Sequence, residues 1–447
     1  MKTYGTYLFF LGLCAIVFNS CSKDIDLIEL PESSSELEHK IIDLYGSLEA
    51  LKLPESDDYF DIPGDPKNVL TFEKVRLGKF LFHETGLALN PNQDIGKNTY
   101  SCASCHHAKA GFQSGMIQGI GEGGIGFGTA GETRTMSPEY SEDQIDTQPI
   151  RSPSILNTAY QKVMLWNGQF GAVGPNTGTE INWTADTPKE TNTLGFEGLE
   201  TQAIAGLSVH RLAIDAAFIE NTGYKEMFDT AFANVQEQDR YSKLNAGLAI
   251  AAFERTVLAN GAPFQQWLKG DRAAMNETEI KGANLFFGKG KCYTCHNGPG
   301  LNGMSFHALG MKDLSGSNVH GTVDEITQKG RGGFTNDPND DYKFKTPTLY
   351  NLKDVAHLGH GGSFTTIKEV IVYKNKAIPE NTIVPSDKLS PQFDPLGLNQ
   401  EEIAQLTAFI ENALYDNALT RYTPTNLPSG NCFPNADDAS RSDLDCN

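Results

Sequence analysis

The chain of 447 residues has little positive charge, since 36 Lys and Arg stand against 56 Asp and Glu and the net charge is −20. Nucleic-acid binding needs a basic face, so this deficit argues against a nucleic-acid-binding protein. An acidic surface fits either simple solubility or attraction of a basic partner protein. After the N-terminus no apolar run approaches the ~20 residues of a membrane-spanning helix. We therefore expect membrane contact through the N-terminus alone.

The N-terminus combines Lys2 with a short apolar run from about Tyr7 to Phe18, followed by small polar residues and Cys21. Such a run is too short for a membrane span and is typical of a secretory signal. Its end resembles a lipoprotein cleavage site, which predicts a signal peptide at 1–21 and an exported lipoprotein anchored at Cys21, facing the periplasm or the cell surface. An ordinary secretory signal cleaved nearby is the alternative.

Cysteines are few, and the eight present divide into groups. Cys14 lies in the signal peptide and Cys21 would carry the lipid, while four others belong to two motifs considered next. Cys432 and Cys446 remain, in a tail rich in Gly, Asn and Asp. In an oxidising compartment we expect these two to form a structural disulfide.

Two motifs of the form Cys-x-x-Cys-His occur, made by Cys102, Cys105 and His106 and by Cys292, Cys295 and His296. In this motif the thiols can bond to the vinyl groups of haem while the histidine ligates the iron, so the pattern predicts two covalently bound c-type haems. Zinc sites and redox disulfides also use Cys-x-x-Cys. Zinc ribbons, however, bring their two pairs within roughly 15–20 residues, whereas here residues 106 to 291 intervene. We therefore favour haem and redox chemistry.

The apolar residues of the body mostly follow the helical period, notably at 70–82, 225–235 and 241–260. Between them, Gly-, Thr-, Asn- and Pro-rich stretches at 115–149 and 167–194 predict long loops. Haem can replace a large part of a protein core, so a haem domain can be stable with long irregular segments. We predict a mainly α protein with two cytochrome c-like haem domains in tandem and long irregular loops.

The second half repeats the first in outline. FKTPTLYNL at 344–352 echoes IRSPSILNT at 150–158, and HGGSF at 360–364 follows it as WNGQF follows the earlier segment. This indicates an internal duplication with one haem per unit. The expected organisation is a signal peptide at 1–21, a polar tether at 22–62, an N-terminal haem domain at 63–265, a C-terminal haem domain at 266–423, and a tail with the disulfide at 424–447.

These landmarks resemble those of the bacterial diheme cytochrome c peroxidases and their relative MauG. They run in family order from LTFEKVRLGKFLF and CASCH through RSPSILNTAY, LWNGQF, LETQA and AAFERT to CYTCHNG, FKTPTLYN and HGGSFTTIKEVIVYKN, over residues 62–420. The resemblance implies a cytochrome-c peroxidase that reduces hydrogen peroxide to water with electrons from a small periplasmic cytochrome c or cupredoxin. A MauG-like oxidase of a protein or organic substrate and a non-catalytic diheme electron carrier stay open as alternatives, as does the family's homodimer.

The resemblance also implies a division of labour between the haems. The N-terminal haem, with His106 as proximal ligand, would meet peroxide and would be the peroxidatic site. The C-terminal haem, with His296, would receive electrons from the donor. Trp166 matches the tryptophan that lies between the haems in the family, although a buried core aromatic is the plainer reading. Gln202 belongs to the Leu-Glu-x-Gln-Ala element near the peroxide site.

The distal side of the N-terminal haem departs from the family pattern. The histidine of peroxidases that need reductive activation would fall on Gln144, and no histidine lies between His107 and His210, so we expect an open haem without prior reduction. His210 stands where the family has its glutamate, and Arg211 follows. A histidine can move the proton during O–O cleavage and a guanidinium can stabilise the leaving hydroxide. A helix-surface position or a contact with a haem propionate is the alternative for both.

The electron-entry haem departs as well. The family's methionine ligand lies about thirteen or fourteen residues after the histidine of a His-x-Gly element, and the count from His360 reaches Tyr373. We predict Tyr373 as the sixth ligand, a phenolate that would lower the reduction potential. Met304 and Met311 are rival ligands in a nearby loop.

The family also implies a calcium ion between the domains. Ser152 replaces the asparagine ligand of the family, and residues 355–357 would supply carbonyl groups. Serine is a poorer, neutral ligand, so calcium stays open.

Overall fold

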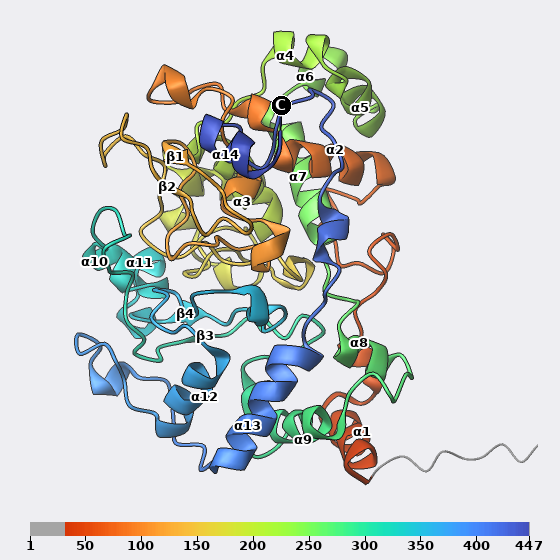
Figure 1. Cartoon of the computed structure of the whole chain (residues 1–447), viewed down its shortest axis with the longest axis vertical. Helices are drawn as coiled ribbons and strands as arrows, with labels where there is room; N and C mark the ends of the chain where they lie inside the picture. Colours follow the sequence, from red (N-terminus) through yellow and green to blue (C-terminus); the bar gives the residue numbers. More distant parts are fainter. Residues whose placement is uncertain (1–31, 447) are drawn as a thin grey trace, which may run out of the picture.

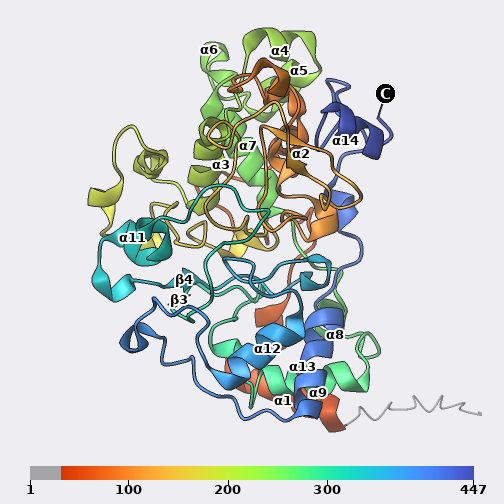
Figure 2. The same ribbon diagram turned by 60° about the vertical axis from the view of Figure 1, so that its left-hand side comes forward.

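The computed structural model describes residues 32–446, which form an elongated body of two halves stacked along its longest axis (Figures 1 and 2). The body is mainly helical, as predicted. Within the described residues the strands form two sheets of two short strands each, β1 with β2 and β3 with β4.

The N-terminal half is built on three helices, α2, α3 and α7, that pack together. They bury Leu77, Leu81 and Phe82 against Ile250 and Phe253. Its elements are α2 (Phe72–His83), β1 (Gly124–Ile125), β2 (Thr135–Met136), α3 (Gly198–Val209), α4 (Ala216–Asn221), α5 (Tyr224–Ala231), α6 (Glu237–Arg240) and α7 (Lys243–Arg255).

The C-terminal half is built on α9 and α13, with α1 and α8 beside them (Figure 1). Its elements are α1 (Glu32–Tyr45), α8 (Pro263–Leu268), α9 (Glu277–Phe286), β3 (Phe306–His307), α10 (Glu325–Gln328), α11 (Arg331–Thr335), β4 (Phe344–Lys345), α12 (Ile367–Lys376), α13 (Gln400–Ala408) and the π-helical turn η14 (Phe409–Ala413). A last helix, α14 (Asp438–Asp443), lies in the tail.

Short 3₁₀ helices punctuate the loops. They are η1 (Leu48–Leu51), η2 (Thr85–Leu87), η3 (Asp94–Gly96), η4 (Cys102–Ser104), η5 (Ala108–Ala110), η6 (Thr158–Tyr160), η7 (Gly174–Asn176), η8 (Glu180–Asn182), η9 (Pro188–Leu194), η10 (Cys292–Thr294), η11 (Pro338–Asp340), η12 (Leu352–Asp354), η13 (Ser386–Lys388) and η15 (Leu419–Tyr422).

The three segments with helical periodicity are helices in the structure. Segment 70–82 covers all but the last residue of α2, 225–235 overlaps α5, and 241–260 contains α7. The predicted loops carry no α-helix: 115–149 holds β1 and β2, and 167–194 holds 3₁₀ turns.

The two halves share their principal helix crossing. At Gly78 of α2 any side chain would collide with the carbonyl of Ala249 in α7, and at Gly282 of α9 it would collide with that of Gln405 in α13. Each half therefore needs glycine at the point where the helix before its Cys-x-x-Cys-His motif crosses a later helix. This equivalence supports the internal duplication read from the sequence.

The repeated loop segments also adopt the same conformation. Asn157 and Asn351 both have left-handed backbones, with φ of 58° and 56°. The Asn157 N–H donates to the Val257 carbonyl (2.9 Å) and the Asn351 N–H to that of Leu414 (3.0 Å). Each repeat then closes an isolated antiparallel bridge, Met164 with Phe170 and Leu358 with Phe364.

The N-terminal segment differs from its prediction as a tether. Residues 32–62 are folded onto the C-terminal half, where α1 packs on α9. Gln265 of α8 accepts from the Leu53 N–H (2.8 Å) and donates to the Leu51 carbonyl (3.0 Å). The tether prediction is wrong for this segment because its polar composition hides a buried apolar series, Leu37, Ile41, Leu51 and Leu53.

The domain limits differ in two further respects. A boundary at 265/266 would cut α8, which packs against η1 and η14 and so belongs with the C-terminal half. The tail, conversely, returns to the N-terminal half, where α14 contacts β1 (Figure 1). The N-terminal segment is thus part of the C-terminal half, and the C-terminal tail is part of the N-terminal half.

No helix within residues 32–446 is both long and apolar enough to cross a bilayer. The predicted signal peptide and the Cys21 anchor lie outside the described residues.

Candidate functional site

Both Cys-x-x-Cys-His motifs present their histidine in the same way. Each begins in a 3₁₀ turn, η4 or η10. His106 Nδ1 donates to the Phe112 carbonyl (3.3 Å), and His296 Nδ1 donates to the carbonyls of Leu301 (3.2 Å) and Pro347 (3.0 Å). A backbone acceptor at Nδ1 leaves the Nε2 lone pair for a metal. Burial lowers the pKa of both histidines to about 4, which keeps them in the neutral form that ligates iron.

The four cysteines of the motifs are free thiols, whereas Cys432 and Cys446 form the predicted disulfide. Burial raises the pKa of Cys102, Cys105 and Cys292 to about 12. Over residues 32–446 no group of three or more His, Cys, Asp and Glu side chains is arranged to hold a metal ion. The two thiols and the adjoining histidine of each motif are the groups that would hold a c-type haem.

A cavity of about 470 Å³ opens beside the second motif. Cys292, Cys295 and His296 line it, and α12 supplies part of the wall. Cofactor sites typically measure roughly 300–1,000 Å³ and are mainly apolar. The cavity therefore fits a haem held by this motif.

The residues of α12 that line the cavity are Ile367, Val370, Ile371 and Lys374. Tyr373 is not among them. Its hydroxyl donates to the Leu309 carbonyl (2.6 Å), and its ring packs between Phe364 and Phe393 at centroid distances of 5.0 and 5.2 Å. In this arrangement Tyr373 is held outside the cavity, and its role as an iron ligand stays a prediction. Of the two rival methionines, Met311 lines the cavity and Met304 does not.

Lys374 brings a cation into this largely apolar space. Burial lowers the pKa of Lys374, and the nearby Cys295 and Cys292 act against that shift. Its ammonium lies 5.1 Å from the centre of the Phe393 ring. Among the residues that the structure describes, no carboxylate pairs with it. Sequence reasoning did not single out this residue.

Trp166 lies where the two halves meet. It lines the cavity of the second motif, and its ring meets His360 edge-on at 6.3 Å. Its Nε1 donates to the Arg151 carbonyl (2.8 Å). Two residues further on, the Pro153 carbonyl is one of the hydrogen-bond acceptors of His106. Trp166 is therefore in contact with the segments around both motifs.

Gln202 and His210 share one face of α3. They are separated by Gly206, where an added Cβ would lie 3.6 Å from Gln202 Nε2 and 3.9 Å from the His210 ring. Because Gly206 has no side chain, the two polar groups border an open patch. His210 ends the helix as its C-cap. It is near enough to His106 that its charge lowers the pKa of that histidine.

His210 is paired with a buried carboxylate that the sequence did not reveal. Its Nδ1 lies 2.8 Å from Asp146 Oδ2, and the exposed fractions of the two side chains are 34% and 6%. Burial opposes the charged imidazole, but the charge and hydrogen bond of Asp146 outweigh it and raise the pKa of His210. The ring is thus oriented through Nδ1, with Nε2 free to exchange a proton.

Arg211 forms a second pair, with Glu122. Glu122 is fully buried and also accepts from the Tyr140 hydroxyl (3.1 Å). Arg211 adopts a left-handed backbone, φ 55°, and its Nη2 is buried without a partner in the described part of the chain. The loop at 115–149 therefore supplies the two carboxylates that hold His210 and Arg211. No periodicity or motif in that loop could have identified them.

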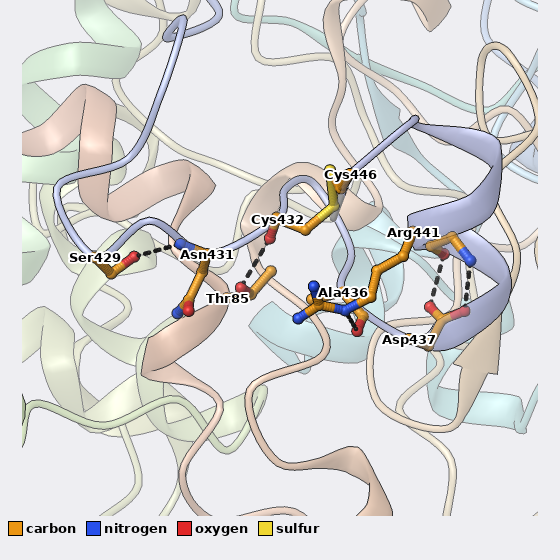
Figure 3. Close-up of a disulfide and its surroundings, with 9 residues drawn as sticks. Thr85, Ser429, Asn431, Cys432, Ala436, Asp437, Arg441 and Cys446 are labelled. Atoms are coloured by element: carbon orange, nitrogen blue, oxygen red, sulfur yellow. Dashed lines mark hydrogen bonds between the residues drawn. A yellow bond between two sulfur atoms is a disulfide. The ribbon is translucent and has the colours of Figure 1, made fainter.

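The C-terminal tail fastens the first motif, and Figure 3 shows the disulfide of this tail. Ser101 Oγ donates to the Pro434 carbonyl (2.9 Å), and Ser104 Oγ bonds to the Asn435 side chain. A buried ion pair joins Asp437 to Arg134 (3.2 Å) in the loop that carries Glu122. The disulfide closes the tail around these contacts.

The structure lends no support to a calcium ion at Ser152. The adjacent Arg151 is buried, and its guanidinium donates to the carbonyls of Ser114 (3.3 Å) and Met116 (2.9 Å). Burial and the charge of Arg151 lower the pKa of His357, in the loop expected to supply calcium ligands. A buried cation therefore lies directly beside Ser152, and a second cation there would be repelled.

Known proteins match the chain in sequence and in fold. Residues 72–273 match the family described as di-haem cytochrome c peroxidase. The cytochrome-c peroxidase IdrP1 of Denitromonas iodatirespirans is 28% identical over 384 residues, 80% of this chain and 86% of its own. The methylamine utilization protein MauG of Methylophilus methylotrophus is 28% identical over 376 residues, 81% of this chain and 88% of its own.

Among solved structures, a MauG-like protein associated with microbial copper homeostasis superposes with a TM-score of 0.55 at 24% identity, covering 82% of this chain and 95% of its own. The diheme peroxidase BthA from Burkholderia thailandensis gives a TM-score of 0.50 at 16% identity, covering 80% and 89%. These two likenesses establish the fold. With the sequence matches and the paired motifs, they show that the chain is similar in sequence and fold to the di-haem cytochrome c peroxidases and MauG.

Proposed function

We propose that this protein reduces hydrogen peroxide to water at its N-terminal haem, with electrons that a small donor protein delivers to the C-terminal haem. The observation that carries the proposal is the pair of His210 and Asp146 beside His106. An oriented, partly exposed imidazole of raised pKa is the group that O–O cleavage requires. In the cavity of His296, His360 also pairs with a carboxylate, Asp313 (3.3 Å), but its ring lies flat against that of Phe344 at a centroid distance of 3.8 Å.

The reaction consumes one peroxide, two electrons and two protons and yields two water molecules. A haem bound through His106 would supply the iron at which peroxide binds and the electrons that break the O–O bond. His210 Nε2 accepts the proton of the oxygen nearer the iron and returns it to the leaving oxygen. Asp146 stabilises the imidazolium between these two transfers. Gln202 offers its amide as a hydrogen-bond donor to peroxide from the same helix face.

Arg211 has a smaller role in this scheme than the sequence predicted. Its charge is compensated by Glu122, and its buried Nη2, which has no partner in the described residues, remains to donate to the leaving hydroxide. Trp166 links the cavity of His296 to the Arg151–Pro153 segment behind His106. We propose it as the bridging group for electrons. The protein would work outside the cytoplasm, where c-type haem is attached, on a lipid anchor at Cys21.

Spectra and kinetics of the mature protein with both haems test the proposal. The resting oxidised form should show one high-spin and one low-spin haem, and it should react with peroxide without prior reduction. Reduced cytochrome c or cupredoxin should then be oxidised in a ratio of two electrons per peroxide. Two low-spin haems that ignore peroxide would identify an electron carrier instead. Peroxide-driven oxidation of a protein or amine substrate in preference to the donor would identify a MauG-like oxidase.

A further inference from the structure

The cavity beside His296 contains few side chains able to ligate iron from the face opposite this histidine. His307 is committed at both nitrogens, to Ser390 Oγ (2.9 Å) and Ser305 Oγ (2.8 Å). His360 lies flat against the Phe344 ring at a centroid distance of 3.8 Å. Stacking and paired hydrogen bonds hold both rings in place, so neither is free to turn to a metal.

Two further donors belong to the boundary between the halves. His357 packs at Gly362 beside Arg151, whose side chain is part of the N-terminal half's loop network. Lys345 donates its ammonium to Gln161, a residue of the N-terminal half. The lining set also holds the oxygen donors Asp313, Tyr342 and Asp394, and Asp313 already accepts from His360 (3.3 Å) and Asn381 (3.0 Å). Among the nitrogen and sulfur donors outside the motif segment 291–296, Met311 and Lys374 remain.

The helix α12 aims Lys374 into the cavity. Successive residues are about 100° apart around a helix, so Ile367, Val370, Ile371 and Lys374 form one stripe, and all four line the cavity. Lys374 is the member of this stripe with an electron-pair donor. A capping box between Thr366 and Glu369 fixes the start of the helix.

Met311 is less well presented. It lies in irregular chain, and its sulfur packs close to Gly359, where an added Cβ would lie 3.3 Å from it. The lysine, by contrast, has a long flexible stem on a rigid helix and no carboxylate to hold its nitrogen elsewhere in the described chain.

We propose that the deprotonated Nζ of Lys374 is the sixth ligand of the C-terminal haem. An amine opposite His296 closes this iron to peroxide and leaves it an electron-transfer centre. As a harder donor than a thioether, the amine favours ferric iron and lowers the reduction potential relative to methionine. The assignment concerns only the ligand of this iron, so it stands or falls independently of the substrate at the other haem.

The test is the ferric low-spin signal of the mature protein with both haems. Near-infrared magnetic circular dichroism distinguishes amine, thioether and phenolate ligands in the unmodified chain. Lys374→Leu should abolish the amine signature and convert this haem to high spin or to a new ligand, with a positive shift in its potential. Lys376→Leu is the matched control, because Lys376 is an exposed lysine of the same helix, and it should change neither the spectrum nor the potential.

Met311→Leu and Tyr373→Phe decide between the rivals. Both should keep the amine signature. A thioether signature that disappears in Met311→Leu, or a phenolate signature that disappears in Tyr373→Phe, would overturn the proposal. Since the wild-type spectrum identifies the ligand directly, the assignment is decided even if Lys374→Leu fails to incorporate haem.

Discussion

The pairing of His210 with Asp146 predicts how a single oxygen-to-nitrogen change will slow the enzyme. Asp146→Asn keeps the size of the side chain but removes the charge that lies 2.8 Å from His210 Nδ1. A hydrogen bond to a charged group contributes about 1.5–3 kcal/mol. If the variant loses all of this energy in the transition state, where His210 carries the proton, the first peroxide step should slow by about 10- to 150-fold. Stopped-flow mixing of the oxidised protein with peroxide measures this rate constant.

The pH profile separates this mechanism from simple disruption. Because Asp146 raises the pKa of His210, and because His210 must be neutral to accept the peroxide proton, the wild-type rate should climb through a pKa above the ordinary histidine value. In Asp146→Asn that rise should move to lower pH while the plateau falls. A merely loosened site would lower the plateau without moving the inflection.

A double-mutant cycle completes the argument. His210→Gln alone should cost about 10²–10⁴-fold, and adding Asp146→Asn should cost almost nothing more, because the carboxylate acts through the ring. Glu142→Gln is the matched control: Glu142 pairs with His320 at 3.4 Å on the surface and should not affect the rate. Independent, multiplicative losses in the double variant would refute the relay.

Three further predictions concern stability and electron flow. Burial raises the pKa of Glu254 to about 8, so the free energy of unfolding should fall as pH rises from about 4.5 to 8. In denaturant titrations, Glu254→Gln should flatten this pH dependence and stabilise the protein by up to about 3 kcal/mol at pH 7. An unchanged pH dependence in the variant would contradict this prediction. Replacing Cys432 and Cys446 with serine should lower the free energy of unfolding by about 3 kcal/mol, because the disulfide closes a loop of sequence separation 14. The same change should speed amide hydrogen exchange at residues 101–104. Unchanged exchange there would show that the tail does not fasten the motif. Trp166→Phe loses a buried hydrogen bond worth about 1 kcal/mol and should slow reoxidation of the C-terminal haem by peroxide while both haem spectra persist; an unaltered rate would exclude it as the bridge.

Much of the fold was predictable because it is encoded locally. Each Cys-x-x-Cys-His motif is contiguous, and the helices α2 and α7 show their period over a single segment. The duplication was visible because Asn157 and Asn351 occupy the same place in two similar segments and share one backbone conformation. His210 was found through its position in a motif, although nothing in the sequence showed what it contacts.

The carboxylates behind the site were not predictable for a physical reason. Asp146 meets a residue 64 positions away and Glu122 one 89 positions away. Their loop is irregular, so no period relates a residue to the face it presents. The tail posed the same difficulty, because its grip on Ser101 and Ser104 joins positions more than 300 residues apart. The composition of the tail did not indicate which residues it contacts.

Tyr373 and Lys374 show how finely a helix divides neighbouring side chains. A step of one residue turns the side chain by about 100°, enough to move it from the wall of a cavity to the apolar contacts behind that wall. A count of thirteen or fourteen positions along the chain covers both Tyr373 and its neighbour Lys374, so distance in sequence cannot decide between them. The stripe of Ile367, Val370 and Ile371 distinguishes the two residues, because all three line the cavity and Lys374 lies on the same side of the helix. To find a metal ligand on a helix, one should therefore first identify, from its apolar residues, the side of the helix that faces the cavity. The ligand is then the residue on that side with an electron-pair donor.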